Sequence, residues 1–158
     1  MTVTHPNPSD PLTAQIVESL YTDALLLADE ARAAFDGSAP HSLQAVAEPA
    51  NVALSIEGLR TTTRIMHILA WLLNQRAFMA GELNERQLRL HGALPKDRLS
   101  EPEQLSLLDE RTRALIAESE RLHARIARLD EQQRHHDGPA AQAAPVHFLH
   151  NKLRSAFG

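Results

Sequence analysis

The sequence predicts an all-α protein: an antiparallel three-helix bundle with a short extra helix and a flexible C-terminal tail. Of its 158 residues, 43% are hydrophobic but only 4% are aromatic, so leucine and alanine dominate the apolar set. This composition favours helices, because both residues have high helix propensity and β-branched residues are sparse. Long stretches also repeat apolar residues every three or four positions, the period of a helix with one buried face.

The first helix is expected over residues 10–36. Residues 1–9 are polar and contain prolines, which predicts a disordered N-terminus. Asp10 can cap the first turn, Pro11 fits the first helical position, and Gly37 is a natural stop. A loop follows, and the whole bundle domain is expected to span residues 10–136.

The second helix is expected over 49–80, with Pro49 in its first turn and Gly81 after its end. Between Ile65 and Leu73 it is apolar on nearly every side, which a single domain cannot readily cover. Surface left over here or on the last helix therefore predicts a homodimer. One apolar stripe contains Val52, Ile56, Leu59, Thr63, Met66, Leu69, Ala70, Leu73 and Ala77. The candidate dimer or partner interface contains Ile65, Ile68, Trp71 and Leu72, with Arg60 and Arg64 as possible contacts for an acidic segment.

Two further helices complete the bundle. Asn84 and Gln87 form a capping box for a short helix over 84–91. Ser100 and Glu103 form a second box, which predicts one long helix over 101–135. Its leucines recur every seventh residue, at Leu108, Leu115, Leu122 and Leu129. This seam is expected to pack against the other helices of the chain, with a possible extension into a dimer contact.

A DNA-binding zipper is disfavoured. Such a zipper needs a basic region directly before the heptads, but residues 94–104 are a mixed-charge connector with prolines. The formal net charge is −4, and no segment forms a basic stripe. The sequence therefore predicts no nucleic-acid partner.

Motifs for chemistry are also missing, which predicts a protein that is not an enzyme and has no metal or cofactor. There are no cysteines, and the nine histidines lack the spacing of a metal-binding set. No glycine-rich phosphate loop or G-x-S-x-G motif occurs. The longest apolar run, IMHILAWLL, is too short to cross a bilayer, and no signal peptide is recognisable. A cytoplasmic protein without membrane contact is expected.

The C-terminal end predicts a tethered motif. Residues 137–145, DGPAAQAAP, have the composition of a flexible linker. Residues 146–158 then regain apolar residues at helical spacing: Phe148, Leu149, Leu153 and Phe157. This tail segment either covers apolar surface on its own bundle or dimer mate, or docks in a partner's groove with Lys152 and Arg154 at acidic rim residues.

Two stretches resemble the RcdA family of alphaproteobacteria: TTTRIMHILAWLLNQRAFMAGEL, residues 61–83, and RLHARIARLDEQ, residues 121–132. The shared elements are a T-T-R opening, an A-W-L-L-x-Q-R/K-A core, an A-G-E stop and an R-x-A-R-L-D-E ending. LYTDALLLADEAR, residues 20–32, is a looser match. The likeness covers the second and last long helices and is weaker elsewhere.

The resemblance implies a homodimeric three-helix bundle without enzymatic activity. RcdA-like proteins are adaptors that deliver cell-cycle regulators such as CtrA to the ClpXP protease. They act with the response-regulator-like protein CpdR bound to ClpX. The expected partners are therefore a second copy, ClpX with a CpdR-like protein, and a protein cargo. Two alternatives remain: a DNA-associated transcriptional regulator and a self-associating structural bundle.

Overall fold

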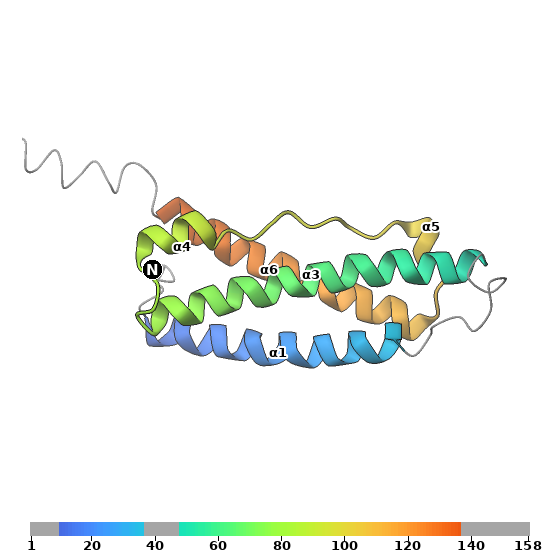
Figure 1. Ribbon diagram of the computed structural model, residues 1–158, viewed down its shortest axis with the longest axis horizontal. Helices are drawn as coiled ribbons and strands as arrows, with labels where there is room; N and C mark the ends of the chain where they lie inside the picture. Colours follow the sequence, from blue (N-terminus) through green and yellow to red (C-terminus); the bar gives the residue numbers. More distant parts are fainter. Residues whose placement is uncertain (1–9, 37–47, 137–158) are drawn as a thin grey trace, which may run out of the picture.

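Three long helices pack side by side in the computed structural model, which describes residues 10–36 and 48–136 (Figure 1). They are α1 (Pro11–Asp36), α3 (Pro49–Met79) and α6 (Glu110–His136). Two short helices, α4 (Glu85–His91) and α5 (Pro102–Leu105), lie between α3 and α6 in the chain. The described residues contain no strand, so the predicted all-α bundle is confirmed.

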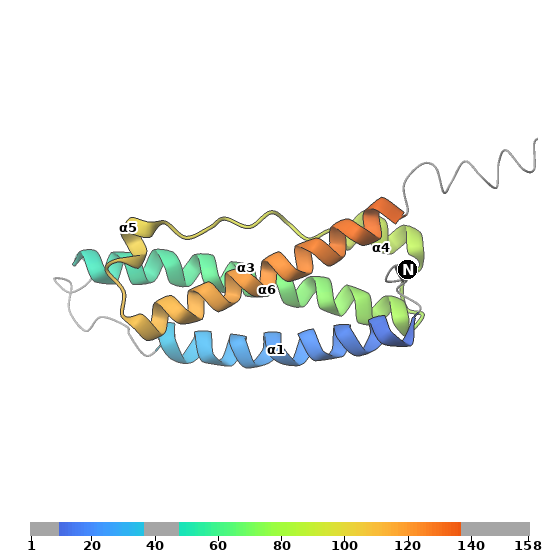
Figure 2. The ribbon, with the colours of Figure 1, turned by 180° about the vertical axis from the view of Figure 1, so that it is seen from behind.

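The helix directions differ from a fully antiparallel arrangement, because α3 and α6 run the same way. Side-chain hydrogen bonds join Arg64 to Ser119, Trp71 to Asp130 and Gln75 to Gln133, so the two helices advance together. Only α1 runs opposite to both (Figures 1 and 2). The cause is the connecting segment 92–101, which has no regular secondary structure and carries the chain back along the bundle.

The hydrophobic core lies where the three long helices meet. Trp71 fills its centre at 2% exposure, and its indole N–H donates to Asp130 at 2.9 Å. Burying an aromatic side chain with its polar atom bonded combines a large apolar contribution with a satisfied donor. The other buried members of the cluster are Val17, Leu20, Ala24, Leu27, Ala31, Ile65, Ile68, Leu72, Leu115, Leu122 and Ile126.

Helix ends follow local chemistry where the capping signals are strong. The Asn84 side chain accepts from the Gln87 amide at 2.9 Å, and the Gln87 side chain accepts from the Asn84 amide at 3.0 Å, so the predicted capping box is confirmed. Pro49 occupies the first turn of α3 as predicted. Gly81 has φ 77°, a left-handed conformation that glycine adopts at little cost.

The prediction of one helix over 101–135 is wrong, because a break separates α5 from α6. Asp109 caps α6 instead, accepting from the Thr112 amide at 2.7 Å. Ser100 forms no cap: its hydroxyl is buried without a hydrogen-bond partner, and its amide donates to Glu120. A carboxylate at the N-cap satisfies free amides and complements the helix dipole, so Asp109 gives a better start than the Ser100 box.

Close packing of α1 on α3 depends on Gly58. A Cβ built at this position would lie 2.9 Å from Cδ1 of Phe35. We expect Gly58→Ala to lower the free energy of unfolding by about 1–2 kcal/mol, because overpacking outweighs the helix propensity of alanine. Urea titration measures the change. Adding Phe35→Leu to the Gly58→Ala variant should restore part of the lost stability, because it removes the ring that the new methyl group meets. A Gly58→Ala variant more stable than wild type would contradict this packing.

A buried polar network holds the connecting segment 92–101 against α3 and α6. Arg64, 1% exposed, donates to Asp97 at 2.7 Å, to Ser119 at 2.9 Å and to the Arg98 carbonyl at 3.0 Å. On α6, Nε2 of His123 donates to the Pro95 carbonyl at 3.1 Å. Because the segment is bonded to both α3 and α6, it fixes the position of one helix relative to the other.

Acid should weaken this network through His123. Burial lowers the pKa of this imidazole below its ordinary value, with Arg64 and His67 acting in the same direction and Asp97 opposing them. A lowered folded-state pKa means that the unfolded chain takes up the proton first, so stability falls as pH drops below about 6.5. We expect His123→Gln to lose less stability than wild type between pH 7.5 and 5 in urea titrations. Equal losses of stability in the variant and in wild type would show that His123 is not the group through which acid destabilises the fold.

Candidate protein-interaction surfaces

The outward face of α3 carries a continuous apolar stripe, here called the α3 seam. Its large members lie seven residues apart and are exposed: Val52 42%, Leu59 71%, Met66 63% and Leu73 47%. The smaller side chains that complete the same stripe are also uncharged. The complete α3 seam is Val52, Ile56, Leu59, Thr63, Met66, Ala70, Leu73, Ala77 and Ala80, alternating steps of four and three.

Charged residues of α3 lie outside the seam and are all engaged by other elements or neighbours. Within Pro49–Met79 they are Glu57, Arg60, Arg64 and Arg76. Arg76 pairs with Glu18 of α1 at 2.8 Å, and Arg60 pairs with Glu57 and with Glu101, each at 2.8 Å. An alternating four-three spacing without charges is the pattern by which one helix packs along another. Exposed apolar surface of this extent is typical of a protein interface.

The predicted interface residues lie elsewhere. Ile65, Ile68, Trp71 and Leu72 are between 0 and 4% exposed inside a single chain, so they form core instead of a surface for a partner. The prediction that these four side chains contact a partner is corrected accordingly. The other predicted apolar stripe of this helix, from Val52 to Ala77, faces outward except at Leu69, which packs against the core.

The two predicted arginines also serve the fold. Arg64 is buried and pairs with Asp97 at 2.7 Å and more distantly with Glu120 at 3.4 Å. The Arg60 side chain is 13% exposed and holds two carboxylates. Neither guanidinium is available to an acidic partner segment. Arg60 and Arg64 thus hold the start of α5 and the connecting segment against α3.

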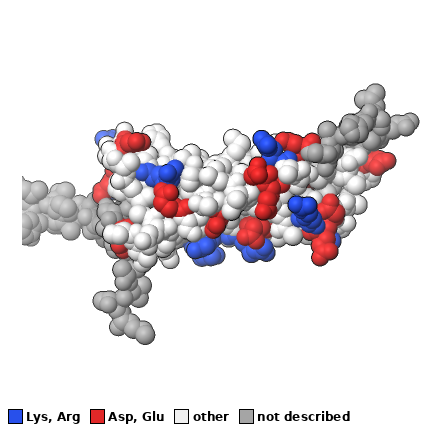
Figure 3. Space-filling view, turned by 90° about the horizontal axis from the view of Figure 1, so that it is seen from below, with Lys and Arg blue, Asp and Glu red and all other residues white. Residues whose placement is uncertain are grey.

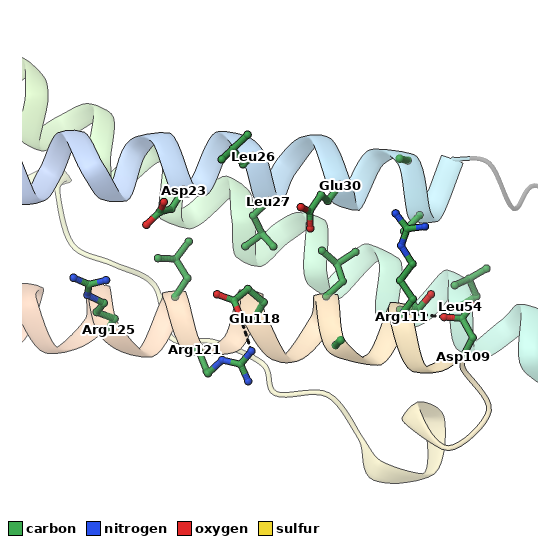
Figure 4. A pocket seen from close by; sticks show the side chains of 16 residues that line it. Asp23, Leu26, Leu27, Glu30, Leu54, Asp109, Arg111, Glu118, Arg121 and Arg125 are labelled. Atoms are coloured by element: carbon green, nitrogen blue, oxygen red, sulfur yellow. Dashed lines mark hydrogen bonds and ion pairs between the residues drawn. The ribbon is translucent and has the colours of Figure 1, made fainter.

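A groove runs between the C-terminal half of α1 and the N-terminal half of α6, here called the α1–α6 groove (Figure 4). Its volume is about 990 Å³. Sequence reasoning missed it, because the distance between two helices far apart in the chain leaves no local signal. The lining residues are Asp23, Leu26, Leu27, Glu30, Ala33, Ala34, Leu54, Asp109, Arg111, Thr112, Ala114, Leu115, Glu118, Arg121, Leu122 and Arg125.

The two walls of the groove differ in charge. Asp23 and Glu30 extend from α1 toward α6, whereas the α6 wall carries three arginines (Figure 4). Arg121 pairs with Glu118 of its own helix. Seen from the α1 side, acidic and basic side chains are interspersed over the surface (Figure 3). An apolar floor between charged walls is suited to an amphipathic helix.

Over residues 10–36 and 48–136, no group of three or more histidine or acidic side chains is arranged to hold a metal ion. No helix in those ranges combines the length and apolar character needed to span a bilayer. The tail residues Phe148, Leu149, Leu153 and Phe157, like the linker and the N-terminal residues, lie outside the described part of the chain.

Comparison with known proteins places the chain in a family. No curated protein and no solved structure matched it. A family model described as "Protein of unknown function (DUF1465)" matches residues 9–157, which is nearly the whole chain and includes both surfaces. The chain therefore belongs to the DUF1465 family.

Proposed function

We propose that this protein is a homodimeric, non-enzymatic adaptor of the RcdA type. In this role it helps deliver cell-cycle regulatory proteins to the ClpXP protease, together with a CpdR-like protein. The RcdA-like motifs supporting the proposal lie in α3 and α6, the helices joined by the buried polar network. The proposal assigns binding, and no chemical step, to this chain.

The observation that carries the proposal is the α3 seam. Four large apolar side chains between 42 and 71% exposed lie on one uncharged helix face. Because the seam repeats in sevens, a second α3 can pack along it over roughly 40 Å, given a rise of about 1.5 Å per residue. A two-fold arrangement presents the same patch on both copies and satisfies both seams at once.

Capture of purified components tests the adaptor role. The full chain is immobilised and exposed to purified ClpX with and without the CpdR-like protein, and then to purified CtrA. We expect retention of CtrA by the adaptor and of ClpX in the presence of the CpdR-like protein. Retention of neither would overturn the proposal. Self-association without any retention would favour the structural bundle, and salt-dependent retention of duplex DNA would favour the transcriptional regulator.

A further inference from the structure

We propose that the tail segment, residues 146–158, binds as a helix in the α1–α6 groove of its own chain. The groove is a place for a fourth helix on a three-helix bundle. Leu26, 62% exposed, lies on its α1 wall, next to the buried Leu27, Leu115 and Leu122. The inference concerns the chain's own assembly and does not depend on ClpXP.

The linker has the length that this placement requires. α6 ends at His136, and the near end of the groove is at Arg125 on the same helix. Eleven residues of helix separate them by about 16 Å, at 1.5 Å per residue. A flexible chain with the nine residues of 137–145 has a root-mean-square length of about 15–18 Å. A linker whose length matches the span gives the highest effective concentration.

The direction and length of the tail segment also match. α6 ends at the same end of the bundle at which α1 begins (Figures 1 and 2). The segment would therefore enter the groove at Arg125 and run parallel to α1. The groove extends along α6 from Arg125 to Arg111, about 21 Å at the helical rise. A helix from His147 to Phe157 is about 15 Å long and fits within it.

Charge spacing fixes the register. Asp23 and Glu30 lie seven residues apart on the α1 wall, and no ion pair is found for either among the described residues. His147 and Arg154 are also seven residues apart. A parallel tail helix therefore places Arg154 beside Glu30 and His147 beside Asp23, since seven residues are close to two helical turns.

The apolar residues of the tail segment then face the floor. On a helix, Phe148, Leu149, Leu153 and Phe157 cover one half of the circumference, and Arg154 lies beyond the border formed by Phe157. That half turns toward Leu26 and the α6 leucines when Arg154 points to α1. The covering role of the tail, one of its two sequence-based interpretations, thereby gains a specific site.

Cysteine cross-linking of the full chain tests the placement, because the protein has no cysteine of its own. In this register Gly158, which lies on the same side of the tail helix as Arg154, comes near Ala33, an exposed groove residue. We expect Ala33→Cys with Gly158→Cys to form an intramolecular disulfide at least about tenfold faster than the matched control, as docking raises the local concentration. The control pairs Gly158→Cys with Ala124→Cys, an exposed alanine of α6 that does not line the groove.

Charge exchange tests the register in the same cross-linking assay. Glu30→Arg should slow the disulfide several-fold, and adding Arg154→Glu should restore its rate, because the ion pair is rebuilt in reverse. Equal rates for the groove and control pairs would overturn the proposal. A covalent dimer from the groove pair would also overturn it, since the groove would then hold the tail of a second copy.

Discussion

Replacing Arg64 by methionine is expected to lower the free energy of unfolding by about 3–5 kcal/mol, the usual cost of removing one partner from a buried ion pair. The guanidinium is 1% exposed and joins Asp97, Ser119 and the Arg98 carbonyl across two elements. Methionine fills much of the volume but leaves these acceptors without a donor. Urea unfolding followed by circular dichroism measures the loss.

Two variants separate the charge network from helix propensity. Arg128→Met changes an exposed position of α6 and should shift stability by no more than about 0.5 kcal/mol. Arg64→Lys keeps the charge but lacks the planar fork that reaches several acceptors, so most of the loss should remain. A cost below about 1 kcal/mol for Arg64→Met would mean that the connecting segment is held by other contacts.

Placing glutamate at Leu59 and Met66 should abolish self-association through the α3 seam. These are the two most exposed large side chains of the seam, at 71 and 63%. In a two-fold interface each substitution buries an unpaired carboxylate in each copy, at several kcal/mol. The dissociation constant of the dimer should therefore rise at least about 100-fold, since each 1.4 kcal/mol is a factor of ten. Sedimentation at micromolar concentration should show a dimer for wild type and a monomer for the variant.

The matched control is Leu90→Glu. Leu90 is 65% exposed but lies on α4, away from the seam, so this variant should remain dimeric. Both variants should keep wild-type helicity, because the substituted side chains already face solvent within one chain. A wild-type protein that sediments only as a monomer would exclude the α3 seam as a dimer interface.

Periodicity located the three long helices but did not reveal which face of α3 points inward. The core-facing side of α3 includes Glu57, Thr61, Arg64 and Gln75, all buried, alongside its isoleucines and Trp71. The outward side has no charged residue, so hydrophobicity alone makes it look equally suited to the core. Two of these polar groups, Arg64 and Gln75, are bonded by partners from α6 and segment 92–101, and those partners are distant in sequence.

Local signals were reliable where they act within a few residues, as at Pro49 and in the Asn84 capping box. The break before α6 was missed because the Ser100–Glu103 spacing has the pattern of a capping box, whereas Asp109 caps α6 and the Ser100 amide donates to Glu120 of that helix. The α1–α6 groove could not be predicted, since it depends on the distance between two helices far apart in the chain. That distance follows from packing, which no helical period encodes.

Reconstituted proteolysis tests the proposed role most directly. Degradation of purified CtrA by ClpXP with the CpdR-like protein is followed with and without this protein, using the Leu59→Glu/Met66→Glu variant and Leu90→Glu in parallel. We predict faster degradation with wild type and with Leu90→Glu, because holding cargo beside the protease raises its effective concentration. Unchanged degradation of CtrA and of other cell-cycle regulators by wild type would contradict the adaptor function.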